Sequence, residues 1–131
     1  MRTSLYWFGL LFTLVSSQIA TTAWSQQPQS QIPDNYGAIA TSPDGRIWGY
    51  SYDYPNREQA EQKALSECGR SGADCEVQVW FKNACGSVAR NDQGNIGWAW
   101  ADTRAAAEAQ AILACNAEGC STETWVCTTR Y

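Results

Sequence analysis

The sequence predicts an α+β fold in which one ββαβ unit occurs twice and the two units pack as one small disulfide-stabilised domain. The first observation is an internal repeat with a period of about 45 residues, typical of one supersecondary unit used twice. The second is that cysteines recur within it, so both units carry the same covalent link. The repeated residues are Arg57, Ala60, Glu61, Ala64, Leu65, Cys68, Cys75 and Trp80, which recur as Arg104, Ala107, Glu108, Ala111, Ile112, Cys115, Cys120 and Trp125.

The start of the chain has the features of a secretory signal peptide over residues 1–25. Arg2 supplies the positive charge, residues 5–15 form a short apolar run, and residues 23–25 place small residues before a cleavage site. Polar residues 16–18 end the run well before the roughly 20 apolar residues that a membrane-spanning helix needs. We therefore expect a secreted or periplasmic protein with no membrane anchor after cleavage.

The part that follows the signal peptide divides into a leader and one domain. Residues 26–34 are polar and rich in Gln and Pro, which predicts a disordered leader. The domain is expected over residues 35–131, with unit one at residues 35–82 and unit two at residues 85–128. All six cysteines lie in this part, and an even number in a small exported chain predicts three disulfides.

Unit one has a strand signal at Tyr36–Thr41, a Ser-Pro-Asp-Gly turn at residues 42–45 and a second strand at residues 46–52. Asn56 can cap the helix that follows, because a Gln three residues later completes a pattern like the capping box. A third strand is expected at residues 76–81. The buried stripe of the helix is Ala60, Ala64, Leu65 and Cys68.

Unit two repeats this order, with Asp102 or Thr103 as the helix cap. Its strands are expected at Cys85–Arg90, Ile96–Ala101 and residues 122–128, and its helix at about residues 103–116.

The sizes of the side chains on the second strand of each unit differ between its two faces. Gly49 and Ser51 alternate with aromatic rings in unit one, as Gly97 and Ala99 do in unit two. We expect the Ala-rich helices to lie against the flat faces and the rings to fill space where the units meet. Most rings are then expected in the core, with Tyr54 and some second-strand rings partly exposed.

The repeat also predicts which cysteines pair. Each unit has one cysteine at the end of its helix and one near the start of the next strand, so local disulfides Cys68–Cys75 and Cys115–Cys120 are expected. Cys85 and Cys127 then remain and pair with each other. Spacing alone leaves 15 connectivities open, and the repeat selects among them.

Five motifs together are similar to those of a known family. They are Tyr36-Gly37-Ala38-Ile39-Ala40, Trp48-Gly49-Tyr50-Ser51-Tyr52, Arg57-Glu58-Gln59-Ala60-Glu61, Trp80-Phe81-Lys82-Asn83-Ala84-Cys85 and Gly97-Trp98-Ala99-Trp100. Over about residues 35–128 the chain resembles the bacterial domain-of-unknown-function family 4189. The resemblance implies a small exported protein or module with this duplication, and it supplies no catalytic residues.

Composition excludes several kinds of chemistry. The chain contains no histidine, which removes the Ser/His/Asp and Cys/His arrangements and the commonest zinc ligand. It has no CxxC pair, so we expect no metal and no cofactor. A net charge of −4 without clustered Lys or Arg argues against nucleic acid as a partner.

Carboxylates remain as candidate catalysts for hydrolysis of a glycan. Asp53 and Asp102 occupy nearly equivalent positions before the two helices, with Arg57 and Arg104 one turn later. The simpler interpretation is structural: each Asp caps a helix and pairs with the arginine.

These patterns favour an exported, non-catalytic binding module over an enzyme. The expected partner is an unidentified protein, for which a secreted or periplasmic enzyme inhibited by the module is one example. A cell-wall or other glycan bound through exposed rings is the alternative, and a carboxylate-based hydrolase is the third candidate. The candidate binding surface is Tyr50, Tyr52, Tyr54, Trp98 and Trp100.

Overall fold

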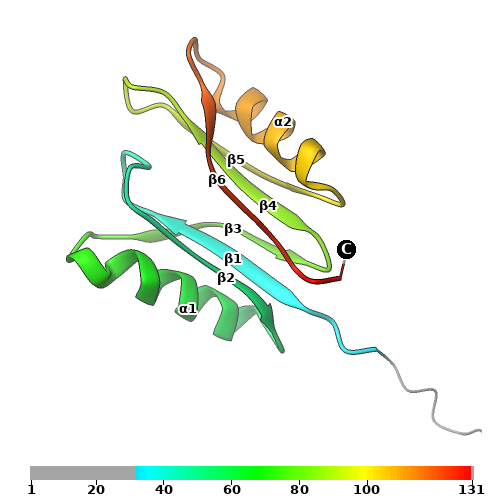
Figure 1. Cartoon of the computed structure of the whole chain (residues 1–131). Helices are drawn as coiled ribbons and strands as arrows, with labels where there is room; N and C mark the ends of the chain where they lie inside the picture. Colours follow the sequence, from blue (N-terminus) through cyan, green and yellow to red (C-terminus); the bar gives the residue numbers. More distant parts are fainter. Residues whose placement is uncertain (1–31, 131) are drawn as a thin grey trace, which may run out of the picture. The chain divides into compact units, whose positions relative to one another are not determined.

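The computed structural model describes residues 32–130, so the expected signal peptide lies outside the described residues. Two antiparallel sheets of three strands each have one helix against one face (Figure 1). Their strand orders are β2-β1-β3 and β5-β4-β6, which confirms the duplicated ββαβ unit and the α+β class. The elements are β1 (Tyr36–Thr41), β2 (Trp48–Tyr54), α1 (Arg57–Cys68), the 3-10 turn η1 (Gly69–Ser71), β3 (Glu76–Lys82), β4 (Cys85–Arg90), β5 (Ile96–Ala101), α2 (Arg104–Cys115) and β6 (Ser121–Cys127).

Both helices begin at a side-chain cap, because the first N–H groups of a helix have no partner within it. The side chain of Asn56 accepts a hydrogen bond from the N–H of Gln59 at 2.9 Å. Thr103 accepts one from the N–H of Ala106 at 3.2 Å, so Thr103 rather than Asp102 caps α2.

Each helix lies very close to its sheet because the second strand presents a glycine to it. A Cβ atom on Gly49 would lie 2.3 Å from the backbone nitrogen of Cys68. On Gly97 it would lie 2.0 Å from the backbone nitrogen of Cys115. Since the helices contribute mainly buried alanines to these contacts, the expected packing of a small-residue helix on a flat face is observed.

The opposite faces of the two sheets pack on each other, with β1 against β4, β2 against β6 and β3 against β4 and β5. Phe81 lies at the centre of this contact and is 1% exposed. A Cβ atom on Gly37 or on Gly86 would come within 2.4 Å of the Phe81 ring, so the ring lies against a glycine of each sheet. The other buried members are Ile39, Val79, Ala84, Val88 and Val126.

The expectation that most aromatic rings lie in the core is wrong. The sheets do meet through their ring-bearing faces, but aliphatic residues and Phe81 fill the centre. Most of the rings belong to the edge strands β2, β5, β3 and β6, where they have neighbours on one side only. Seven of these residues are each more than a third exposed: Trp48, Tyr50, Tyr52, Trp80, Trp98, Trp100 and Trp125.

The structure contains three disulfides, Cys68–Cys75, Cys115–Cys120 and Cys85–Cys127, which are the pairs that the repeat predicts. The third joins directly paired residues of β4 and β6.

Removing the long-range disulfide should cost more stability than removing a local one. Cys85 and Cys127 are 42 residues apart, whereas Cys115 and Cys120 are 5 apart. In the chain-entropy treatment this difference corresponds to about 2 kcal/mol. We expect urea unfolding to show a larger decrease in the free energy of unfolding for the Cys85→Ala/Cys127→Ala protein than for the Cys115→Ala/Cys120→Ala protein. A larger loss for Cys115→Ala/Cys120→Ala would contradict it.

Candidate functional site

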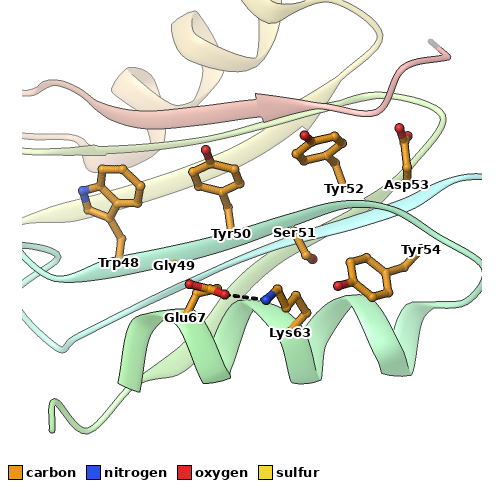
Figure 2. Close-up of a pocket in the computed structure, with 9 residues that line it drawn as sticks. All are labelled: Trp48, Gly49, Tyr50, Ser51, Tyr52, Asp53, Tyr54, Lys63 and Glu67. Carbon is orange, nitrogen blue, oxygen red and sulfur yellow. Dashed lines mark hydrogen bonds and ion pairs between the residues drawn. The ribbon is translucent and has the colours of Figure 1, made fainter. Parts of the chain in front are cut away.

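Trp48, Tyr50 and Tyr52 form a continuous row on β2, the β2 ring row. Because Gly49 and Ser51 face α1, the period-two alternation of the strand turns all three rings to the other face. The ring centroids are 5.8 and 6.5 Å apart, and the planes are inclined by 24° and 27°. The three side chains are 37%, 40% and 49% exposed. Figure 2 shows them side by side above the strand.

Trp98 and Trp100 form the equivalent β5 ring row in the second sheet. Trp98 and Trp100 are 44% and 55% exposed. Gly97, which lies between Ile96 and Trp98 on the same strand and faces α2, is buried. The same alternation of small and aromatic residues therefore exposes rings in both units.

Each ring row borders a groove where an edge strand of one sheet meets an edge strand of the other. The β2 ring row and residues 123–127 of β6 line a recess of about 450 Å³. Residues 78–82 of β3 and residues 98–100 of β5 line one of about 610 Å³. Residues 78–82 and 123–127 are equivalent in the repeat, so the groove itself is duplicated.

The two grooves differ in charge. Glu123 lies in the first and is 3.8 Å from the guanidinium of Arg90. Lys82 lies in the second and is 3.5 Å from Asp34. One groove thus carries a carboxylate and the other an ammonium group beside exposed rings.

A third recess of about 630 Å³ follows the outer edge of β2. All residues of the strand, Trp48–Tyr54, line it together with Lys63 and Glu67 of α1. Lys63 donates a hydrogen bond to Glu67, which also pairs with Arg70 at 3.0 Å (Figure 2). The hydrogen bond from Lys63 holds the pKa of the Glu67 carboxyl below its ordinary value. The same bond raises the pKa of Lys63.

The structure does not bring the five predicted surface residues together. Tyr50 and Tyr52 share the β2 ring row, and Trp98 and Trp100 share the β5 ring row. Tyr54 is half-buried and packs with the Ala-rich cluster on the α1 side of its sheet. That these residues bind a partner remains a prediction. The predicted binding surface omits Trp48, although the alternation of small and aromatic residues along β2 places Trp48 on the same face as Tyr50 and Tyr52.

The proposed pairing of each arginine with the preceding aspartate is wrong. Arg57 pairs with Glu61 at 2.6 Å, and its guanidinium lies 4.5 Å from the centre of the Trp80 ring. Arg104 pairs with Glu108 at 2.7 Å and lies 3.6 Å from the Trp125 ring. These stacked arginines and tryptophans are a structural element common to both units.

Asp53 does not cap α1 either. Its backbone is left-handed, with φ of 60°, and its Oδ1 accepts a hydrogen bond from the N–H of Thr129 at 2.9 Å. Asp53 thus ties unit one to the segment after β6. The strand irregularity between Tyr36 and Ala38 accompanies this turn of the chain.

Within residues 32–130 no group of three or more Cys, Asp or Glu side chains is placed to hold a metal ion. All six cysteines are in disulfides.

Over the same part of the chain, no helix combines the length and the apolar character needed to cross a membrane.

Comparison with known proteins identifies relatives of unassigned function. A family model described as domain of unknown function (DUF4189) matches residues 36–127. Protein Rv1269c of Mycobacterium tuberculosis and Protein Mb1300c of Mycobacterium bovis are each 45% identical over 97 residues, which cover 72% of this chain and 70% of theirs. The NMR structure of Rv1813c from Mycobacterium tuberculosis is similar with a TM-score of 0.54 and 29% identity, covering 97% of this chain and 98% of that one.

Proposed function

We propose that the chain, which belongs to the DUF4189 family, is an exported, non-catalytic module that binds a protein partner. The description of the family assigns no activity, so the proposal is based on the candidate site of this chain. One observation carries the proposal: the edge strands β2 and β5 both keep rows of rings exposed in a domain whose core, apart from Phe81, is built from aliphatic residues. Tyr and Trp combine a large apolar surface with a polar tip, and they dominate protein interfaces.

The scaffold supports binding in a second way. The three disulfides anchor β3 and β6, the strands that border the ring rows, because Cys75 and Cys120 directly precede these strands and Cys127 ends β6. A scaffold fixed in this way loses less conformational entropy when a partner docks. Disulfides also persist in oxidising compartments, which supports the proposed export.

Affinity capture of exported proteins from the native host tests the proposal. We expect wild-type protein to retain a partner that the Tyr50→Ala/Tyr52→Ala variant binds at least about tenfold more weakly, because interface rings often contribute 2 kcal/mol or more. Leu113→Ala is the matched control, since Leu113 is 76% exposed but lies on α2. Equal capture by all three proteins would contradict the proposal. Turnover of a cell-wall peptide or glycan by the pure protein would contradict its non-catalytic part.

A glycan is the second candidate ligand. It is favoured by the small angles between successive rings of the β2 ring row, which make one platform along the strand. Co-sedimentation with insoluble peptidoglycan tests it. Retention of wild-type protein that is lost in Tyr50→Ala/Tyr52→Ala would replace the protein partner by a glycan.

A further inference from the structure

The recess beside β2 lies at the free edge of the strand. Its lining includes residues from both faces of β2: rings from one face, and Gly49 and Ser51, with Lys63 and Glu67 of α1, from the other (Figure 2). A single recess can touch both faces of a strand only at an edge. The other edge of β2 is occupied by β1, so the recess runs along the unpaired one.

The backbone groups that point into this recess can be assigned from the register. The N–H of Ser42 donates to the carbonyl of Ile47 at 2.8 Å, which makes these residues a hydrogen-bonded pair. In an antiparallel ladder such pairs alternate with non-hydrogen-bonded ones. Thr41 with Trp48 and Ile39 with Tyr50 are therefore non-hydrogen-bonded pairs. The N–H and C=O groups of Trp48 and Tyr50 consequently point outward.

This edge lacks the usual features that prevent pairing with another strand. Natural edge strands are blocked by lysine, proline, bulges or inward charges. Between Trp48 and Tyr52 the strand contains only Trp, Gly, Tyr and Ser, and its pairing with β1 is regular from Trp48 to Ser51. The irregularity and the charge of Asp53 come only at its end.

We propose that the outer edge of β2 binds an extended segment of the partner protein as a fourth strand of the sheet, a proposal that rests on the proposed protein-binding function. Main-chain groups of Trp48 and Tyr50 provide the hydrogen bonds, and side chains on either face provide specificity, as in other cases of strand addition.

The two faces of the edge define the chemistry of the segment. On one face its side chains lie beside Trp48, Tyr50 and Tyr52, so apolar or aromatic residues fit there. On the other face α1 covers Gly49 and Ser51, so side chains of the segment would lie beside Lys63 and Glu67 at the edge of the helix. Lys63 lines the recess together with the carboxylates of Glu67 and Asp53; it donates a hydrogen bond to Glu67, and its ammonium group has further N–H donors. Residues with acceptor side chains fit there. The segment therefore alternates apolar residues with polar residues that can accept a hydrogen bond.

Selection of random peptides displayed on phage tests this alternation. Peptides enriched on the wild-type protein should show period-two alternation over about five residues. Peptides without that period would overturn the proposal. Selection of none, with peptidoglycan fragments bound instead through Tyr50, would also overturn it.

Two variants at one position separate the backbone from the ring. Tyr50→Ala removes the ring and keeps the outward N–H, whereas Tyr50→Pro removes both and is tolerated on an edge strand. For an enriched synthetic peptide we expect Tyr50→Pro to bind at least about fivefold more weakly than Tyr50→Ala, the effect of one hydrogen bond. Near-ultraviolet circular dichroism checks that both variants fold.

The outcomes distinguish the two proposals. If Tyr50→Ala weakens binding and Tyr50→Pro weakens it no further, the rings bind a protein but no strand is added. If neither variant affects the captured partner, the proposed function fails as well. A wild-type dimer that only Tyr50→Pro dissociates would assign the edge to a second copy and overturn the external segment.

Hydrogen exchange in the wild-type protein tests strand addition independently, without any variant. On addition of the synthetic peptide, the amide protons of Trp48 and Tyr50 should exchange at least about tenfold more slowly. Unchanged exchange at both amides in the saturated complex would overturn strand addition.

Discussion

Replacing Gly97 by alanine should destabilise the domain by at least about 3 kcal/mol, because the added methyl group has no space. Its Cβ would lie 2.0 Å from the nitrogen of Cys115 and 2.5 Å from the carbonyl oxygen of Ala111. Both atoms belong to the backbone of α2, so no side chain can move aside and the whole helix must shift. Urea unfolding followed by tryptophan fluorescence measures the loss.

Gly69→Ala is the control for this substitution. Gly69 follows α1 with an ordinary φ of −76°, and a Cβ atom there meets nothing within 4 Å. We expect its unfolding midpoint to stay close to that of the wild type. A Gly97→Ala protein with an equally unchanged midpoint would show that α2 does not lie against β5 as described.

Replacing Phe81 by alanine should cost about 3–5 kcal/mol, the range for a fully buried aromatic residue. The loss affects both units, because the ring lies against Gly37 in one sheet and Gly86 in the other. Thermal and urea unfolding should therefore show one cooperative transition at a lower midpoint. Two separate transitions in the wild type would contradict a shared core.

A double-mutant cycle with Gly86 makes this prediction specific. The three atoms nearest to a Cβ on Gly86 all belong to the Phe81 ring, at 2.4, 2.6 and 3.4 Å. Gly86→Ala should destabilise the wild type but be neutral or stabilising in the Phe81→Ala protein, where the methyl group occupies vacated space. Equal costs in the two backgrounds would contradict the assigned contact.

The repeat made much of this fold predictable. The residue spacing that recurs from Arg57 to Cys68 and from Arg104 to Cys115 indicates the two helices. The alternation of side-chain types after each helix indicates the strand that follows it. The caps Asn56 and Thr103 follow from local hydrogen bonding, which sequence reports well.

The exposure of the rings could not be predicted in the same way. Period two assigns Tyr50 to a face of its strand, but burial depends on how many strands cover that face, which is a tertiary property. With only three strands in each sheet, the aliphatic centre is covered and the edges are not. The contact of Asp53 with Thr129 depends on a left-handed residue and a chain reversal, for which no local pattern was available.

The duplicated groove has a consequence for stoichiometry. Residues 78–82 with the β5 ring row, and residues 123–127 with the β2 ring row, form two related surfaces on one rigid domain. A partner that displays twice a group able to bind these rings would engage the second groove at a high effective concentration, so its avidity would exceed the affinity of either groove alone. Lys82 lies in one groove and Glu123 in the other, so the two grooves can prefer ligand groups of different charge. A single copy of the chain could then bridge two different molecules.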